Sequence, residues 1–510
     1  MVSSWFSGLI SRTIERVEAI QQPALHWLLI FIFVVTLRIY LEDALTHSGS
    51  LSFIAQNNVH EVLFYLAAFG TAAVVLSFGA RVAPDRVLRV LVAFSPIILL
   101  PPLIDIIVSR GGGLQLTYIT NFNTQGLLAR FLTLGGEWRG GGATPGAKVE
   151  AVFILAGIAT YIWVHTKQAI RTVFSTFVFY CSLVAIAVLP VWVRAFGRLF
   201  NSPFDKYQVP GSKLLLILCF ILGVALLYRW PYGRILLRSL RLSRIIIYLA
   251  FLVVGVVYSV QVWGVNLPMP NLVLNAVLVA LAVVASSVFV MVVNDQEDIA
   301  IDRVSNPNRP LPSGSIPLSV YRACGNGTLA FAGIAAAAAG ALPFLLILLG
   351  NGLYVAYSAP PFKLKRWFIL GKASVGIGVL VVMSAGFLLN TTRCSNIMPV
   401  RTIIAVFLAV FVAAFAIDLK DVAGDRLAGL PTLPVKLGEK LARFITALLI
   451  FIVFSIIPFI LSVRSGFIGA VILGIVTSTS LFFRPYREWV TFACFVITLG
   501  YFSALVLGVL

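Results

Sequence analysis

An acidic cluster follows an apolar run of about twenty residues and has the residue types of a cation site. The cluster comprises Asp295, Asp298 and Asp302, spaced i, i+3 and i+7, with Asn294 directly before it. On a continuous helix these positions fall within about 60° of one another, so we expect the three carboxylates to share one face. Carboxylates are costly at the end of a membrane helix and indicate a function there. The cluster therefore predicts a Mg²⁺ site, and Mg²⁺ held by few carboxylates commonly binds a phosphate group as well.

A second cluster repeats this spacing at Asp418, Asp421 and Asp425. Residues 231–510 contain nine acidic residues, of which only two lie outside the two acidic segments: Glu439 and Glu488. Two carboxylate clusters that face each other repel, and bridging cations remove that repulsion. We therefore expect two or more Mg²⁺ ions between the clusters, where they would clamp a diphosphate. The alternative, that the acids only solvate helix ends, suits one cluster better than two with matching spacing.

Basic residues lie between the two clusters in the sequence. The stretch 354–366 reads Tyr-Val-Ala-Tyr-Ser-Ala-Pro-Pro-Phe-Lys-Leu-Lys-Arg. We expect Lys363, Lys365 and Arg309 to contact a departing diphosphate, because cationic donors recognise phosphate groups. Two further bases are better explained by the positive charge that is usual in inner loops: Arg366 and Lys372.

The composition indicates an all-α polytopic membrane protein. The chain has 510 residues, of which 60% are hydrophobic and 11% are charged, and apolar runs near the length of a membrane span recur throughout. We attribute the net charge of +19 to basic residues in the loops, where they set the membrane topology and contact phospholipid head groups. No nucleic-acid partner is therefore expected. The five cysteines form no CxxC pair, and all four histidines lie before residue 166. Neither a zinc site nor histidine catalysis is therefore expected near the acidic clusters.

We expect about 15 transmembrane helices in two sets. The first set of six comprises residues 24–42, 60–79, 87–108, 148–166, 170–195 and 213–229. The second set of nine comprises residues 245–264, 271–294, 317–339, 342–357, 370–390, 401–418, 441–462, 466–483 and 489–509. A basic stretch at 229–244 separates the sets. We therefore predict two domains: an N-terminal membrane module at 1–230 and a second domain at 231–510.

Loop charges predict the orientation of this integral, multi-pass protein. With the N-terminus inside, the inner loops collect most of the Lys and Arg residues, which places both acidic clusters and the basic stretch on the cytoplasmic side, in the cell membrane. In the first module, Arg38 and Asp105 lie within apolar runs. We expect them either to form a buried pair or to lie at interface depth. The role of residues 1–230 stays open.

The clusters and the basic stretch belong to three longer motifs: Asn294-Asp295-x-x-Asp298-x-x-x-Asp302 with Arg309-Pro310-Leu311-Pro312-Ser313-Gly314, Tyr357-Ser358-Ala359-Pro360-Pro361-Phe362-Lys363-Leu364-Lys365-Arg366, and Asp418-x-x-Asp421-x-x-x-Asp425-Arg426. In this order they resemble the signatures of the UbiA superfamily of intramembrane prenyltransferases. The resemblance covers about residues 240–510. It implies a nine-helix barrel, open sideways to lipid, that is preceded here by about six further helices. It also implies Mg²⁺-dependent transfer of a prenyl group from a prenyl diphosphate to a lipophilic acceptor.

The resemblance implies a role for each candidate residue. Two or more Mg²⁺ ions would be held directly or through water by Asp295, Asp298, Asp302, Asp418, Asp421 and Asp425. The diphosphate would be bound by Asn294, Arg309, Lys363 and Lys365. The catalytic set would be Tyr357, Lys363 and Arg309, with Tyr357 orienting the diphosphate or shielding the carbocation. Glu297 points off the shared face and is placed outside the metal site.

The acceptor and the reaction type stay open among a few classes. The motifs are more similar to those of enzymes that act on archaeal glycerol lipids, chlorophyllides or quinone precursors than to the haem O or phosphoribose branches. The expected partners are a prenyl diphosphate, a lipophilic acceptor and membrane lipid. One alternative is an intramembrane terpene synthase that cyclises the carbocation without an acceptor. Another is a transporter or binding protein in which the motifs are vestigial.

Overall fold

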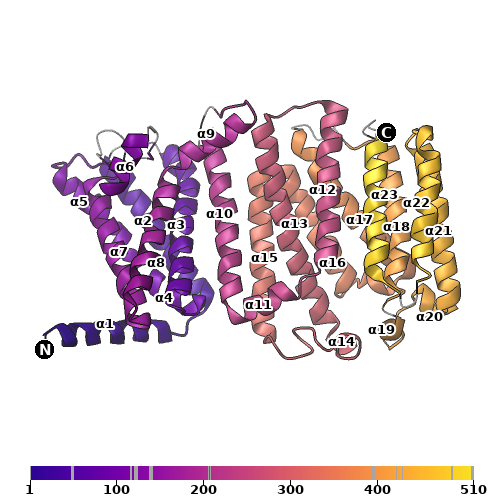
Figure 1. The fold of residues 1–510 in the computed structure, drawn as a ribbon, viewed down its shortest axis with the longest axis horizontal. Helices are drawn as coiled ribbons and strands as arrows, with labels where there is room; N and C mark the ends of the chain where they lie inside the picture. Colours follow the sequence, from indigo (N-terminus) through magenta and orange to yellow (C-terminus); the bar gives the residue numbers. More distant parts are fainter. Residues whose placement is uncertain are drawn as a thin grey trace. The chain divides into compact units, whose positions relative to one another are not determined.

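The computed structural model describes residues 2–46, 51–114, 116, 118–119, 124–136, 142–204, 206, 208–391, 397–420, 422–427, 429–483 and 486–506. Within these ranges the chain forms helices and no strand (Figure 1). Thirteen helical segments are long and apolar enough to cross a membrane, which confirms the all-α polytopic fold. The helices are grouped into two compact units, Met1–Leu237 and Arg238–Leu510.

The first unit contains six of the spanning segments. They are formed by α2 (Ala24–Thr46), α3 (Leu51–Gly79), α4 (Pro84–Phe94) continued by η1 (Ser95–Leu99) and α5 (Leu100–Val108), α7 (Pro145–Thr166), α8 (Ala169–Ala187) and α10 (Gln208–Arg229). The helix α1 (Val2–Ala19) lies across one end of this bundle (Figure 1). Three shorter helices complete the unit: α6 (Thr124–Leu132), α9 (Leu189–Leu199) and α11 (Pro231–Arg238), the last of which ends where the second unit begins.

The intramembrane ions of the first unit have partners other than each other. Arg38 forms an ion pair with Glu42 one helical turn later. The Oδ1 atom of Asp105 accepts a hydrogen bond from the backbone N–H of Gly146 at 2.7 Å. Of the two alternatives expected for these residues, an Arg38–Asp105 pair is therefore wrong, because each residue has a different partner.

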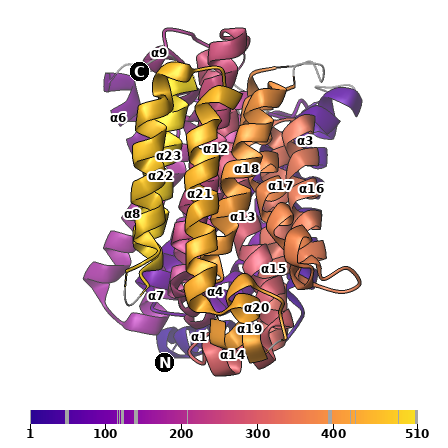
Figure 2. The ribbon, with the colours of Figure 1, turned by 90° about the vertical axis from the view of Figure 1, so that its right-hand side faces the viewer.

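The described part of the second unit contains nine long helices that coincide with the nine expected spans. They are α12 (Leu242–Trp263), α13 (Met269–Glu297), α15 (Leu318–Ala339), α16 (Ala341–Ser358), α17 (Phe368–Phe387), α18 (Val400–Ile417), α21 (Glu439–Ile460), α22 (Phe467–Ser480) and α23 (Glu488–Val506). Two of them are not among the thirteen apolar spans, since α15 is less apolar and α22 has only 14 residues. These two account for the difference from the expected total of about 15. Short helices α14 (Ile299–Ser305), α19 (Val422–Leu427) and α20 (Leu433–Leu437) lie together at one end of the unit (Figure 2).

Two glycines bring α12 and α17 into close contact. Gly255 of α12 lies against the backbone of Met383, and Gly386 of α17 lies against the carbonyl oxygen of Leu252, so neither position has room for a Cβ atom. Small residues permit such an approach in lipid, where packing rather than the hydrophobic effect holds helices together. The contact holds α12 and α17 side by side in the second unit.

We expect Gly386→Ala to lower the unfolding temperature, because the added methyl group must push α17 away from the Leu252 carbonyl group, at a cost of about 1–3 kcal/mol. The matched control is Gly352→Ala in α16, where an added Cβ meets nothing within 4 Å and alanine favours the helix by up to about 1 kcal/mol. Thermal unfolding of the solubilised protein, followed by tryptophan fluorescence, measures both. Equal unfolding temperatures for the two variants would contradict the close approach.

Candidate functional site

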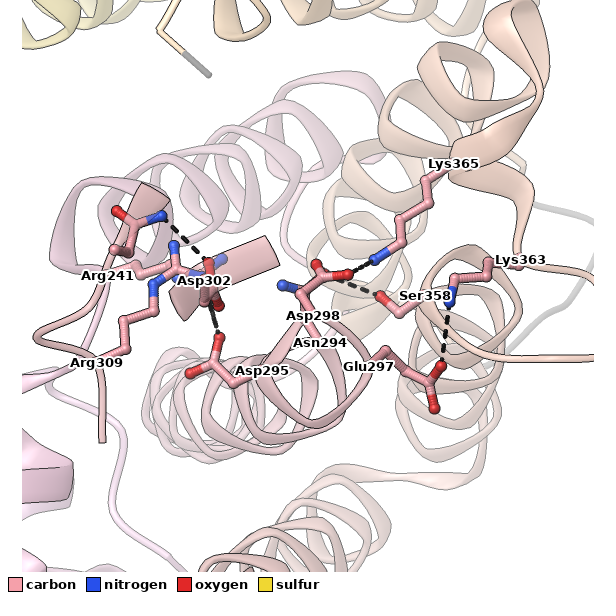
Figure 3. A network of polar contacts seen from close by, with 11 residues as sticks. Arg241, Asn294, Asp295, Glu297, Asp298, Asp302, Arg309, Ser358, Lys363 and Lys365 are labelled. Carbon is pink, nitrogen blue, oxygen red and sulfur yellow. Dashed lines mark hydrogen bonds and ion pairs between the residues drawn. The ribbon is translucent and has the colours of Figure 1, made fainter. Parts of the chain in front are cut away.

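The first acidic segment is not a continuous helix. The helix α13 ends at Glu297, Asp298 has φ −107° and ψ 12°, and α14 begins at Ile299. As a result, Asp295 and Asp302 face the same guanidinium group, while Asp298 faces a different base (Figure 3). The expectation that all three carboxylates share one helix face is therefore wrong for Asp298, because the backbone leaves the helical path at that residue.

Two arginines neutralise the carboxylates on one side of this segment. Arg309 forms an ion pair with Asp302, and its Nη1 atom lies 3.6 Å from Oδ1 of Asp295. The Nη2 atom of Arg241 lies 2.7 Å from the same oxygen, and Tyr321 donates its hydroxyl hydrogen to the other oxygen of Asp295 at 2.8 Å. The two carboxylate side chains are only 3% and 4% exposed. Buried charges of this kind need such compensation, because removal from water is expensive.

Two lysines of the basic stretch occupy the other side of the segment (Figure 3). Lys365 places its Nζ atom 2.6 Å from Oδ1 of Asp298, and Lys363 places its Nζ atom 3.3 Å from Oε2 of Glu297. Ser358, the last residue of α16, donates a hydrogen bond to Oδ1 of Asn294 at 3.3 Å. In the turn that follows α16, Lys363 adopts a left-handed backbone conformation, with φ 45°. The structure thus pairs the basic stretch with the acidic segment, whereas the sequence predicted contacts of these bases with a diphosphate.

The second acidic segment lies against the first. Asp418 follows the end of α18 and forms an ion pair with Lys372 of α17. Asp425 lies in α19, which packs against α14 and therefore against the helix that carries Asp302. Asp421 lies outside the described residues. Figure 2 shows α14 and α19 at the same end of the unit.

In the structure Asp295, Asp298, Asp302 and Asp418 are paired with bases. Among the described residues, no group of three or more His, Cys, Asp or Glu side chains is gathered closely enough to hold a metal ion. The donors nevertheless suit Mg²⁺ by chemical type, since this ion prefers carboxylate oxygens. A cation bound here would compete with the Arg and Lys partners of these carboxylates.

An apolar cavity of about 520 Å³ adjoins the charged residues, and all of its described lining residues belong to the second unit. Arg241, Asn294 and Tyr357 lie among its lining residues, together with many aliphatic side chains of α12, α13, α17 and α18. Tyr248, Tyr354 and Tyr357 form a row of edge-to-face contacts in its wall, with ring centroids 6.2 and 6.4 Å apart. The cavity thus suits a ligand with a long apolar chain and an anionic head.

Four residues near this site were not found by sequence reasoning. Arg241 belongs to the basic stretch at 229–244, for which the sequence predicted only the role of separating the two sets of helices, but the structure puts it beside Asp295 at the start of α12. Burial, followed by the nearby charge of Arg244, lowers the pKa of Arg241, and Asp295 opposes that shift. Lys372 was attributed to ordinary loop charge, although its position inside an apolar run was a usable signal. The tyrosines at 248 and 354 carry no such signal, because aromatic residues are common in membrane helices.

We expect Arg309→Gln to lower the unfolding temperature more than Asp302→Asn, because it leaves two buried carboxylates with less compensation. The double variant should recover part of the loss, with a coupling energy of about 1–3 kcal/mol in a double-mutant cycle of denaturant unfolding. The control is Glu439→Gln, which removes an exposed pair with Arg443 and should change stability by less than about 0.5 kcal/mol. Strictly additive effects of the two site variants would show that the pair does not stabilise the fold.

Comparison of the sequence with known protein families gives a match: residues 249–491 fit the model of the UbiA prenyltransferase family. Digeranylgeranylglyceryl phosphate synthase of Sulfolobus acidocaldarius is 32% identical over 165 residues, which cover 31% of this chain and 58% of that protein. Chloroplastic chlorophyll synthase of Arabidopsis thaliana is 33% identical over 165 residues, which cover 31% of this chain and 42% of that protein. Homogentisate phytyltransferase of Synechocystis sp. is 29% identical over 170 residues, which cover 31% of this chain and 54% of that protein. The chain therefore spans about half the length of these curated relatives.

Solved structures give a weaker similarity. A UbiA homologue from Archaeoglobus fulgidus bound to GPP and Mg²⁺ is 22% identical, with a TM-score of 0.39 over 53% of this chain and 99% of that chain. A UbiA homologue from Aeropyrum pernix is 22% identical, with a TM-score of 0.42 over 51% of this chain and 96% of that chain. The sequence match carries the assignment and confirms the resemblance of the three motifs. Residues 249–491 of this chain match the model of the UbiA prenyltransferase family.

Proposed function

We propose that the second unit transfers a prenyl group from a prenyl diphosphate to a lipophilic acceptor within the membrane and releases diphosphate. One observation carries the proposal: the apolar cavity of about 520 Å³ reaches Arg241, Asn294 and Tyr357, beside the paired acids and bases. A prenyl diphosphate has the same division into apolar chain and anionic head. The curated relatives support this reaction class by their names, which are those of a digeranylgeranylglyceryl phosphate synthase, a chlorophyll synthase and a phytyltransferase.

The bases of the site bind the diphosphate in this proposal. Arg309, Lys363 and Lys365 pair with the acidic segment, and Asn294 of the same segment lines the cavity and adds an amide group. Negative charge grows on the diphosphate as the allylic C–O bond breaks. Cations fixed at that place stabilise the transition state more than the ground state, because they are already oriented toward the developing charge.

We assign the acidic clusters to Mg²⁺ binding. Two or more ions would be held by Asp295, Asp298, Asp302, Asp418, Asp421 and Asp425. When bound, Mg²⁺ neutralises charge on the diphosphate and improves it as a leaving group. Arg309 and Lys365 are already paired with Asp302 and Asp298, so they lie within reach of a diphosphate bound beside the same carboxylates.

After the diphosphate departs, the walls of the cavity protect the prenyl carbocation from water. Its lining is mainly apolar, which keeps water from a cation that would otherwise be hydrolysed. Tyr248, Tyr354 and Tyr357 present aromatic rings to the same space, and aromatic faces attract cations. The acceptor attacks the carbocation and loses a proton. We place this chemistry on the cytoplasmic side of the cell membrane, a placement supported by the basic residues of the inner loops.

Asp298→Asn should lower the rate of diphosphate release at least about 100-fold, because it removes a charged group at the leaving-group site. Chelation of Mg²⁺ should have the same effect on the wild type. Purified protein is given labelled prenyl diphosphates with phenolic, quinoid and glycerol-phosphate acceptors, and the products are identified by mass spectrometry. Glu439→Gln, an acid outside both clusters, should leave the rate unchanged.

The products of the same assay separate the three candidate functions. A prenylated acceptor is expected for the transferase. A cyclic hydrocarbon as the sole product would replace the transferase with a terpene synthase. An absence of turnover with every acceptor, together with retained binding of prenyl diphosphate, would favour a non-catalytic binding protein.

Replacement of an aromatic ring by an aliphatic side chain should weaken protection of the carbocation. Tyr354→Leu should lower the rate about 3- to 30-fold, which corresponds to the usual strength of a cation–π contact, and should raise the share of prenyl alcohol formed by water. Tyr354→Phe keeps the ring and should behave like the wild type in both measurements. Equal losses in the two variants would assign the effect to the hydroxyl group instead.

A further inference from the structure

The first unit contains a cavity of its own, with a volume of about 810 Å³. All of its lining residues belong to the first unit, so it is separate from the cavity of the second unit. Three carboxylates line it, from Glu42 of α2, Glu61 of α3 and Glu150 of α7, whereas Arg130 is the single Lys or Arg side chain among its described lining residues. A surplus of carboxylates inside a membrane unit calls for an explanation, because such groups are expensive there.

One of these carboxylates is fully satisfied by the protein. Glu42 forms an ion pair with Arg38, and its Oε1 atom accepts a hydrogen bond from the backbone N–H of Leu116 at 2.6 Å. His60, which also lines the cavity, is held between Ser212 and Tyr118 at 2.8 Å from each hydroxyl oxygen. These residues form an ordered polar framework at the cavity wall.

The other two carboxylates differ from Glu42. Glu61 and Glu150 both lie within electrostatic reach of the Arg38–Glu42 pair. Neither has a hydrogen bond or an ion pair with any residue that the structure describes. Both side chains line the cavity without a described donor, although both lie in membrane-spanning segments. A ligand that carries hydrogen-bond donors would satisfy them.

The cavity continues into an apolar region that α1 borders. Leu9, Ile10 and Ile14 of α1 contribute to its lining, together with aliphatic side chains of α3, α4 and α7. Glu18, near the end of α1, contacts two residues of α7. Its Oε1 atom accepts a hydrogen bond from the hydroxyl group of Tyr161 at 2.6 Å and lies 2.9 Å from Nε2 of His165. The cavity thus combines a carboxylate-rich part with an apolar part.

We propose that this cavity is a binding site for a lipid whose head presents hydroxyl or ammonium hydrogens to Glu61 and Glu150 and whose apolar chain extends toward α1. A head that is only anionic does not fit, because Glu61 and Glu150 offer it no donor and Arg130 is the single Lys or Arg side chain among the described lining residues. This site does not depend on prenyl transfer by the second unit.

The test uses four probes with the same C12 chain and the full-length protein in phosphatidylcholine nanodiscs. Monolauroylglycerol offers hydroxyl donors and dodecylamine offers ammonium donors, whereas dodecyltrimethylammonium and methyl laurate offer none. We expect monolauroylglycerol, dodecylamine or both to raise the unfolding temperature of the wild type, and the other two to leave it unchanged. Equal responses to all four probes would overturn the proposal.

Substitutions then separate the two kinds of head. In the double variant Glu61→Gln/Glu150→Gln, the amide oxygens still accept from hydroxyl groups, so the response to monolauroylglycerol should persist while the apparent affinity for dodecylamine falls at least tenfold. Glu61→Leu/Glu150→Leu should remove both responses. Asp85→Asn, which removes an exposed carboxylate paired with Arg89, should behave like the wild type. Unchanged responses of the Leu double variant to the probes that stabilise the wild type would show that the carboxylates do not contact the ligand. Where the Leu double variant does not fold, the single variants Glu61→Leu and Glu150→Leu test the same point.

Discussion

Carboxylates buried at helix ends are the constraint that organises the second unit. Asp295 and Asp302 are almost inaccessible to solvent, and each must face a positive charge. Arg309 satisfies both, Arg241 fixes the start of α12 against Asp295, and Lys365 draws the turn after α16 toward Asp298. The interruption of the helix at Asp298 allows this division, because it turns one carboxylate toward the lysines while the others face the arginines (Figure 3).

The same arrangement joins a polar site to an apolar one. The cavity of the second unit is built from membrane helices, so its walls are apolar by necessity, and its polar lining includes the residues that neighbour the ion pairs. An amphipathic substrate can therefore enter from lipid and still present its head to fixed charges. The cavity of the first unit likewise has apolar walls and a polar part. Its polar part contains carboxylates rather than paired acids and bases.

Much of this architecture could be predicted from the sequence, because apolar runs of membrane length determine where helices lie. The spacing of the aspartates predicted two acidic segments, but it could not predict the break at Asp298, since a single non-helical residue leaves the pattern of residue types unchanged. The pairs Arg241–Asp295 and Lys372–Asp418 join residues 54 and 46 positions apart. Such pairs depend on tertiary packing. Glu61 and Glu150 also went unnoticed, because a cavity that brings together α3 and α7 has no signature in either segment alone.

A structure of the protein with Mn²⁺ in place of Mg²⁺ and a non-reactive prenyl thiodiphosphate, with the metal located by its anomalous scattering, tests the central claim most directly. The account predicts metal peaks between the acidic segments around Asp295 and Asp418, the diphosphate at Arg309 and Lys365, and the prenyl chain along the row of tyrosines at 248, 354 and 357. Metal peaks elsewhere, with the chain outside this cavity and the ion pairs of Asp298 and Asp302 intact, would contradict it.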